Sequence, residues 1–272
     1  MLTISGYDIL YTLKTDGNRS FCRAVKAEQD VQVFLHIITS SDSTNHTRQL
    51  QAEYKLISEI EAQGIVPSLD LVVDNRATAI VLSGVDGQLL SEHVKSSALS
   101  IQQFLNIAVQ LTDILGELNR LDIEHHNISL DNFIINKSEQ VFLIDLQYAR
   151  LSGAQQYQSI PRKSLEHLRY ISPEQTGRTS RKVDFRTDIY SLGVVFYQLL
   201  TGRLPYDTDD LVALVHAHIA KIPDLPTQLD SQIPMVLSSI VLKMMEKAPE
   251  MRYQSAIGLK HDLQQCQKLW RR

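Results

Sequence analysis

The stretch IEHHNISLDNFIIN, residues 123–136, together with LIDLQYAR, residues 143–150, decides the fold of this chain. Two apolar runs, FIIN and VFLID, have the composition of a pair of short strands. Asn132 stands at the start of this pair and Asp145 at its end. The amide of Asn127 has no lone pair basic enough to accept a proton near neutral pH, whereas Asp145 offers a carboxylate to a metal ion. Asp145 can therefore bind a metal ion, whereas Asn127 cannot act as a general base.

The same residues resemble the catalytic loop and the metal-binding segment of a protein kinase. The kinase pattern H-x-D-x-x-x-x-N places a carboxylate beside the attacking hydroxyl and a metal-binding amide five residues later. Here those positions are His125, Asn127 and Asn132. The resemblance implies that Asn127 replaces the catalytic Asp and that Asn132 and Asp145 are magnesium positions. It also implies that His125 packs beneath the loop as a structural residue.

Two further departures from the kinase pattern lie around the same reaction centre. Ser129 stands where an active kinase normally has lysine, two residues after the base. Leu146-Gln147 replaces the Phe-Gly pair that follows the metal-binding Asp. The sequence therefore predicts a kinase-like centre with degraded chemistry.

Strand patterns fill the first part of the chain, with one helix among them. The predicted strands are YDILYTL, SFCRAV, VQVFLHII, LDLVV and ATAIVL. Apolar residues at helical spacing predict a helix over Thr47–Gln63 that ends at Gly64. Asp16-Gly17-Asn18 is predicted to be the turn between the first two strands.

Helical patterns dominate after the Gly84–Gly87 segment. Ser100 and Gln103 form a capping-box signature ahead of a helix, a second buried helix is predicted from about Asp188 to Gly202, and later apolar stripes predict two more. In kinase terms this order predicts a single α+β domain over residues 1–272 with two lobes. The strand-rich lobe covers about 7–83, the hinge about 83–87 and the helical lobe about 88–270.

A narrower resemblance is carried by residues 170–226, YISPEQTGRTSRKVDFRTDIYSLGVVFYQLLTGRLPYDTDDLVALVHAHIAKIPDLP. This stretch is similar to the kinase-like domain at the N-terminus of large bacterial multidomain sensor histidine kinases. The last predicted helix runs to Arg272 without an obvious stop signal. We therefore expect that the chain can be a piece of a longer protein.

The resemblance also implies which residues of the first lobe face a nucleotide. His36 stands where kinases carry the lysine that holds the phosphates, and Glu53 matches that lysine's helix partner. A half-buried structural histidine remains the alternative for His36, and a hairpin turn the alternative for a phosphate-cradling Gly17. The purine would lie between Val33 and Leu82 against the hinge backbone, with Ser83 and Val85 as the hinge positions. Asp145 is expected to be a solvent-facing carboxylate of the cleft.

Residues that stabilise the kinase scaffold match the kinase pattern more completely than the catalytic positions do. Glu174 and Arg252 correspond to the ion pair that ties the end of the activation segment to the C-terminal helices, and Asp188 corresponds to the acid that holds the catalytic loop's amides. Leu151–Arg169 would be the activation segment. Its candidate phosphate acceptors are Ser152, Tyr157, Ser159 and Ser164.

Composition excludes several classes of partner. The net charge of −4 gives no general attraction to nucleic acid or anionic lipid, and no run of about 18 apolar residues predicts a membrane span. The distant Cys22 and Cys266 cannot form a disulfide framework, and the start lacks the layout of a secretory signal. We expect a cytoplasmic protein with a protein partner or substrate.

Three functions remain open from the sequence. One is a pseudokinase with a regulatory or scaffolding role and weak binding of ATP and magnesium; another is a slow Ser/Thr kinase; the third is a nucleotide sensor. Loss of the base costs about 10²–10⁴ in rate, and loss of the cationic clamp about 10²–10³ by analogy with other electrostatic donors. From kinase turnover of about 1–100 s⁻¹, roughly one event per hour or slower is left in the less favourable cases.

Overall fold

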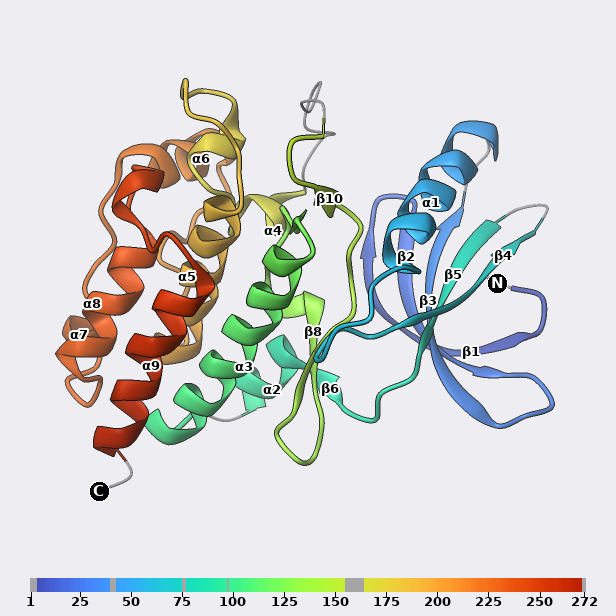
Figure 1. The fold of residues 1–272 in the computed structure, drawn as a ribbon, viewed down its shortest axis with the longest axis horizontal. Coiled ribbons are helices and arrows are strands. Elements are labelled where there is room, and N and C mark those ends of the chain that lie inside the picture. The colour runs from blue at the N-terminus through green and yellow to red at the C-terminus, as the bar shows by residue number, and fades with distance from the viewer. Residues whose placement is uncertain (1–3, 40–42, 75–76, 97, 155–163, 271–272) are drawn as a thin grey trace. The chain divides into compact units, whose positions relative to one another are not determined.

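The computed structural model describes residues 4–39, 43–74, 77–96, 98–154 and 164–270. Its strands are β1 (Tyr7–Asp16), β2 (Arg19–Lys26), β3 (Val31–Thr39), β4 (Ser68–Val73), β5 (Ala77–Ser83), β6 (Gln88–Leu89), β7 (Ile123–Glu124), β8 (Phe133–Ile135), β9 (Val141–Leu143) and β10 (Arg150–Leu151). Its α-helices are α1 (Ser43–Ile57), α2 (Leu90–Ser96), α3 (Ile101–Arg120), α4 (Leu165–Leu168), α5 (Arg186–Thr201), α6 (Leu211–Ala220), α7 (Pro226–Leu229), α8 (Met235–Met244) and α9 (Ala256–Trp270) (Figure 1).

The chain divides into two compact units. The first comprises Met1–Leu89 and Asp131–Gln147, and the second comprises Leu90–Leu130 and Tyr148–Arg272. Strands dominate the first unit and helices the second, so the predicted α+β class is confirmed. β5 ends at Ser83 and β6 begins at Gln88, so the predicted hinge lies between two strands. The predicted lobe boundaries themselves stay a prediction.

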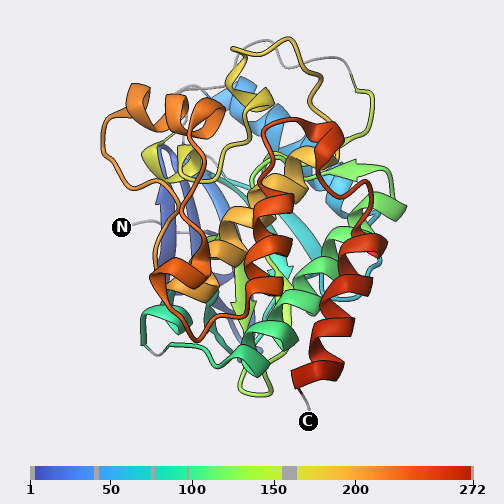
Figure 2. The same cartoon turned by 90° about the vertical axis from the view of Figure 1, so that its left-hand side faces the viewer.

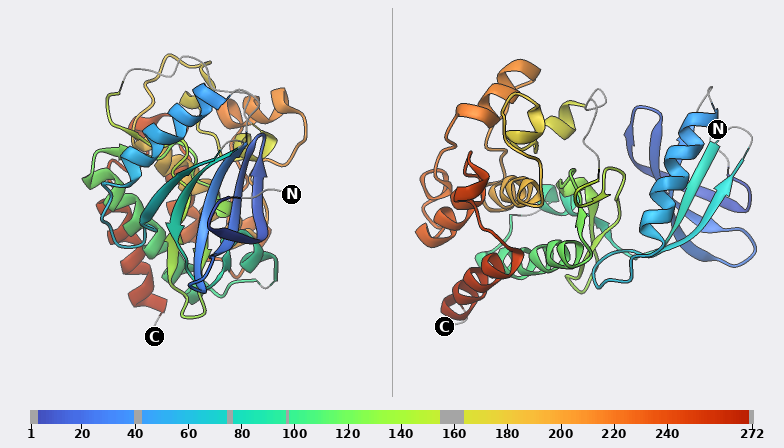
Figure 3. Two further views of the ribbon diagram at one scale, coloured as in Figure 1. Left: turned by 90° about the vertical axis from the view of Figure 1, so that its right-hand side faces the viewer. Right: turned by 45° about the horizontal axis from the view of Figure 1, so that its top comes forward.

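An antiparallel sheet in the order β1-β2-β3-β5-β4 forms the body of the first unit. Alternation along the strands gives the sheet two different faces. One face packs as a core of small and branched side chains, made of Ile4, Cys22, Ala24, Val33, Leu35, Ile37, Ala77, Ala79 and Val81. Helix α1 packs against β3, β4 and β5 and crosses the sheet (Figure 3). The candidate site lies on the face that carries His36.

Helix α1 is shorter at its end than the sequence predicts. It stops at Ile57, whereas the apolar spacing predicted a helix to Gln63. The chain leaves the helix because the segment around Ile65 pairs with β9: Leu143 N donates to Gly64 O at 2.7 Å and Val66 N to Leu143 O at 2.9 Å. Ile60 is buried, as its spacing predicts, but in the turn that follows the helix. A tertiary contact therefore overrides local periodicity here.

A small sheet in the order β6-β8-β9 completes the first unit. β8 and β9 are the two short strands predicted from FIIN and VFLID, and Phe133 lies opposite Leu143. Ile144 N donates to Asn132 O at 3.0 Å, just beyond that pair. The hairpin thus places the residues that flank it, Asn132 and Asp145, at the same end.

Helices build the second unit as the sequence predicts. Ser100 and Gln103 form the predicted capping box at the start of α3. α3 packs beside α9 (Figure 2), and Phe104 of α3 meets Phe196 of α5 edge to face at 5.6 Å between ring centroids. α5 ends at Gly202, whose φ of 69° is the left-handed C-terminal cap. None of the helices in the described ranges is long and apolar enough to cross a membrane.

Candidate nucleotide site of the first unit

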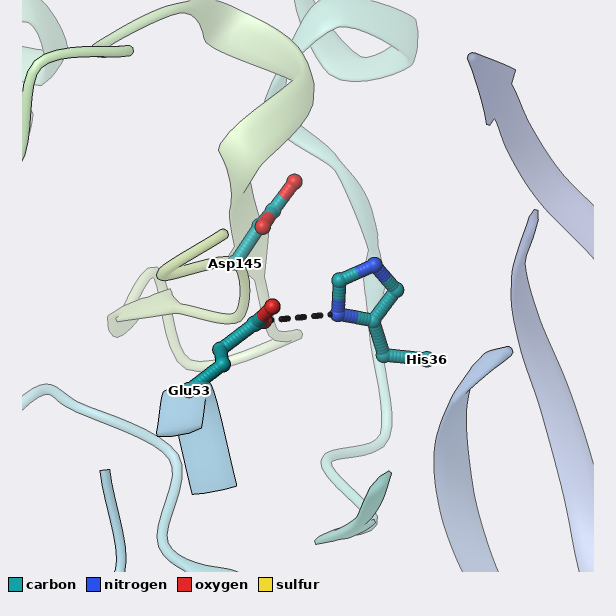
Figure 4. A group of neighbouring side chains, drawn as sticks. All are labelled: His36, Glu53 and Asp145. Carbon is teal, nitrogen blue, oxygen red and sulfur yellow. Dashed lines mark ion pairs between the residues drawn. The ribbon is translucent and has the colours of Figure 1, made fainter. Parts of the chain in front are cut away.

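His36 of β3 and Glu53 of α1 are brought into contact. His36 Nδ1 lies 3.0 Å from Glu53 Oε1 (Figure 4), and the side chains are 5% and 7% exposed. A third residue, Arg19 of β2, joins them: its Nη1 lies 2.9 Å from Glu53 Oε2 and 3.4 Å from His36 Nε2. The ion pair that a kinase makes between lysine and glutamate is thus made here by an arginine from a neighbouring strand.

The partners of His36 define its proton arrangement. A guanidinium can only donate, so His36 Nε2 accepts from Arg19. His36 Nδ1 faces Glu53 Oε1, so both ring nitrogens are in use. Arg19 supplies a permanent positive charge beside Glu53.

Asn132 and Asp145 are brought together by a cation from β1. Lys14 Nζ donates to Asn132 Oδ1 at 2.5 Å and to Asp145 Oδ2 at 2.6 Å. Asn132 is 1% exposed and Asp145 is 3% exposed, so the expectation of a solvent-facing carboxylate is wrong. Burial by itself raises the pKa of Asp145, but the charges of Lys14 and His36 and the hydrogen bonds from Lys14 and the Gln147 amide lower it, so the pKa lies well below its usual range.

The oxygen ligands of this region suit a divalent cation, but the positive charge of Lys14 opposes its binding. Asn132 and Asp145 offer the hard oxygens that magnesium prefers, and ligand atoms of His36, Glu53 and Asp145 lie within 4.8 Å of one another. However, Lys14 already bridges Asn132 and Asp145. With the side chains in this arrangement, the residues do not fit a magnesium ion.

The hinge positions bind an arginine of the first unit. Arg23 Nη2 donates to Val85 O at 3.1 Å and to Gly87 O at 2.9 Å, and the guanidinium lies 5.1 Å from the centroid of the Phe34 ring. Ser83 N donates to Pro67 O at 3.0 Å. The backbone on which a purine was expected to bind is therefore partly committed to protein contacts.

Val33 and Leu82 are not brought together. Val33 belongs to the core on the opposite face of the sheet from His36, whereas Leu82 lies beside His36. The error has a simple cause, because a count one residue out along a strand moves a side chain to the other face. Phe34, two residues before His36, has the orientation expected of Val33. It is fully buried against Phe21, with 5.6 Å between ring centroids.

The space next to His36 is small. A cavity of about 10 Å³, lined by residues that include His36, Glu53 and Leu82, has room for roughly one water molecule. Gly17 lies in the tight turn between β1 and β2, where Asp16 pairs with Arg19 and Gly17 has a φ of 59°. A hairpin turn accounts for this glycine without a ligand.

Asn127 belongs to the second unit, within a loop held by Asp188. The two oxygens of Asp188 accept from the amides of His125 and His126, each at 2.7 Å, so the predicted support of this loop is confirmed. His125 is fully buried and its Nδ1 accepts from Asn127 N at 3.2 Å, which agrees with a structural role. His126 has a φ of 64°, a costly backbone that persists only when neighbours enforce it.

The predicted ion pair between Glu174 and Arg252 is confirmed. Two parallel bonds of 2.7 and 2.8 Å join them, and the side chains are 1% and 0% exposed. Glu174 also accepts from Thr187 Oγ1 at 2.8 Å. Breaking such a buried pair by removing one partner costs about 3–5 kcal/mol. The predicted scaffold contacts of the second unit, those of Asp188 and of Glu174 with Arg252, are therefore present.

Two of the predicted phosphate acceptors can be placed. Ser152 Oγ donates to Glu124 Oε1 at 2.7 Å, and Ser164 caps α4 by accepting from His167 N. The other two, Tyr157 and Ser159, lie outside the described residues. Both placed hydroxyls therefore have structural partners.

The sequence analysis did not predict that Lys14, Arg19 and Arg23 contact the candidate site, although the strand pattern indicated the position of two of them. All three lie in the hairpin around Gly17. In the register of β2 and β3, Arg19 and His36 are diagonal neighbours on one face, and Arg23 lies opposite Phe34. Counting faces from His36 could have found both arginines. Lys14 could not be found this way, because the β1 register shifts immediately before it.

Comparison with known proteins defines the class of this protein. Residues 16–264 match the protein kinase domain family. The chain belongs to that family, and the predicted two-lobed kinase-like fold class is confirmed.

Several relatives extend this result. A 108-residue segment is 52% identical to Hybrid signal transduction histidine kinase G of Dictyostelium discoideum, which covers 40% of this chain and 3% of that protein. The chain is 29% identical over 227 residues to a probable serine/threonine-protein kinase of Clostridium acetobutylicum, covering 83% of this chain and 34% of the relative. Serine/threonine-protein kinase PrkC of Bacillus subtilis is 26% identical over 266 residues, covering 96% and 40%. The chain thus spans a small part of the first relative and about a third of the second.

Proposed function

We propose that this chain is a pseudokinase domain with a regulatory or scaffolding role in signal transduction, acting through a protein partner. The observation that carries the proposal is the position of Lys14, whose ammonium binds both Asn132 and Asp145. Arg19 in turn holds Glu53, and position 36 carries an imidazole in contact with both. The groups that would act on a nucleotide are thus engaged with one another.

The preserved scaffold supports the same proposal. Asp188 and the pair of Glu174 and Arg252 keep the second unit in its fold. A domain that serves as a docking surface needs this framework and does not need a general base. Binding of magnesium and ATP is proposed to be weak, because both Lys14 and the backbone contacts of Arg23 oppose it. The match to part of a histidine kinase is consistent with a regulatory domain of a larger sensor.

A slow Ser/Thr protein kinase is the second candidate. It is favoured by the retention of both Asn132 and Asp145, because the loose transition state of phosphoryl transfer depends on positioning more than on base strength. Relatives named as serine/threonine kinases support it as well. This candidate requires Lys14 to release Asp145 when a nucleotide binds.

One experiment separates the two candidates. We expect transfer of radiolabelled phosphate from ATP to a generic basic protein at no more than roughly one event per hour, with no decrease in Asp145→Asn. Millimolar ATP with magnesium should raise the melting temperature by only about 1–2 °C, since a ligand at its Kd adds about 0.4 kcal/mol. A turnover above about one per minute that Asp145→Asn abolishes would establish the slow kinase instead.

A further inference from the structure

Lys14 occupies the position between the two oxygens that a divalent cation would bridge. Its Nζ lies 2.5 Å from Asn132 Oδ1 and 2.6 Å from Asp145 Oδ2, and those two residues are almost fully buried. We infer that Lys14 is a built-in cation that replaces the divalent metal of this site, and that a metal binds Asn132 and Asp145 only when Lys14 is displaced or removed. The inference rests on the proposed function in placing the metal positions at these two residues.

Charge balance in the first unit supports this inference. Two carboxylates are each paired with a permanent cation. Lys14 Nζ lies 2.6 Å from Asp145 Oδ2, and Arg19 Nη1 lies 2.9 Å from Glu53 Oε2. The charges of these two pairs balance each other without a metal. A divalent ion added to this cluster would be repelled by the nearby charges of Lys14 and Arg19, because solvent screens charges poorly at buried positions.

The backbone of β1 directs Lys14 into this position. The register of β1 and β2 shifts between Thr12 and Lys14, so that Lys14 pairs with Phe21. Irregularities of this kind re-aim side chains. Phe21 lies on the face of His36, and its ring centroid is 5.8 Å from Lys14 Nζ. The lysine is thus held by an aromatic ring and by two oxygens.

Lys14 can leave the site without unfolding the sheet. Its side chain is 23% exposed, whereas that of Asp145 is 4% exposed. The four-carbon stem is flexible and its ammonium is readily hydrated. A metal that enters must nonetheless displace the charge of Lys14. The site therefore has oxygen ligands for a small divalent cation that are masked by one lysine.

Titration with Mn²⁺ alone tests the inference. Lys14→Met removes the ammonium and leaves both oxygens, so Mn²⁺ affinity, measured by the paramagnetic signal of the free ion, should rise at least about tenfold over wild type, or about 1.4 kcal/mol. Mn²⁺ should raise the melting temperature of Lys14→Met and leave that of wild type unchanged. Adding Asp145→Asn to Lys14→Met should remove the gain. Lys26→Met, which removes an exposed lysine at the end of β2, should behave like wild type.

Two results would overturn the inference. One is a folded Lys14→Met protein with wild-type Mn²⁺ affinity. The other is a Mn²⁺ site in wild type whose affinity equals that of Lys14→Met and which Asp145→Asn abolishes. If Lys14→Met is not recovered folded, Lys14→Gln replaces it, because an amide still donates to the oxygens without carrying charge. The wild-type titration decides independently of both variants.

ATP is absent from these titrations, so their outcome is separate from that of the proposed function. A gain of metal binding in Lys14→Met stands even if the domain has no protein partner. Conversely, a failed gain leaves the measured phosphotransfer rate unaffected. In a separate titration with ATP, a loss of ATP binding in Lys14→Met without a gain of Mn²⁺ binding would assign Lys14 to phosphate and overturn the inference.

Discussion

His36 shows why replacing one residue does not empty a site. The imidazole is shorter than a lysine side chain, and Arg19 of β2 pairs with Glu53. Lys14 pairs with Asp145 in the same way. In the proposed pseudokinase, replacement of the kinase lysine is thus accompanied by internal pairing of the groups that remain. Reversing the loss therefore requires more than restoring the missing groups.

We predict that Asn127→Asp alone will not restore phosphotransfer. It supplies the base, but the cation at position 36 is still absent. Asn127→Asp with His36→Lys supplies both. Arg19→Met is added because Arg19 already binds Glu53 at 2.9 Å and would compete with the new lysine. All variants are made in a Lys14→Met background, because Lys14 binds both Asn132 and Asp145, and the triple variant should exceed that background by about 10² or more in radiolabel transfer.

Arg19→Met by itself is the control and should stay at the rate of the Lys14→Met background. If Asn127→Asp alone matched the triple variant, the missing base would be the only defect. If that background matched the triple variant, neither position would limit the reaction.

At the scale of elements, two glycines within helices of the second unit differ in what surrounds them. A Cβ on Gly193 of α5 would lie 2.8 Å from Met244 Cβ and 2.9 Å from Met245 Cγ, at the contact with the end of α8. A Cβ on Gly116 of α3 would meet Ala256 Cβ at 3.6 Å, an ordinary contact. Gly193 is therefore required by close packing, and Gly116 is not.

The two Gly→Ala substitutions should have effects of opposite sign. Both gain up to about 1 kcal/mol of helix propensity. Gly193→Ala also pays for overpacking, about 1–3 kcal/mol, so a net loss of about 1 kcal/mol is expected. Gly116→Ala should be stabilising by some tenths of a kcal/mol or more. Urea unfolding measures both, and equal changes in the two variants would show that the packing of α5 on α8 does not require a glycine.

At the scale of the whole molecule, a buried histidine links stability to pH. His218 of α6 is fully buried and its Nδ1 lies 3.0 Å from Tyr190 Oη. Burial, followed by the charge of Lys247, lowers the pKa of His218 to about 3. The groups around it are Tyr190 and Tyr206, whose pKa values are raised, and Lys247.

Stability should fall as the pH is lowered from about 6.5. In this range His218 binds a proton in the unfolded chain but not in the folded chain. The free energy of unfolding therefore falls by up to about 1.4 kcal/mol per pH unit until about pH 3. Between pH 6.5 and 5 the carboxylates with lowered pKa values, such as Glu124 and Asp184, do not yet contribute. Denaturant unfolding at pH 7, 6 and 5 measures the slope.

His218→Phe should flatten that slope, because it removes the titrating group and keeps a ring in its place. His216→Gln is the matched control, since His216 is an exposed residue of the same helix. It should leave the slope unchanged. A slope that survives His218→Phe would place the acid sensitivity elsewhere in the protein.

Family, scaffold contacts and most elements follow from sequence patterns. The capping box at Ser100 and the stop at Gly202 are local signals carried by a few neighbouring residues, so they could be recognised without the tertiary structure. Asp188 and the pair of Glu174 and Arg252 were found because they stand in register with the kinase pattern, and their predicted contacts are present.

The contacts within the candidate site depend on the tertiary structure. The shift in the β1 register turns Lys14 toward Asp145, strand alternation exchanges Val33 for Phe34, and pairing with β9 ends α1 early. Each of these depends on contacts between residues distant in sequence. Periodicity and motif spacing report what one segment does, whereas a charge pair such as Lys14 with Asp145 is fixed by where two segments meet. That is why motif spacing could name candidate positions such as Asn132 and Asp145 but not the partner that binds them.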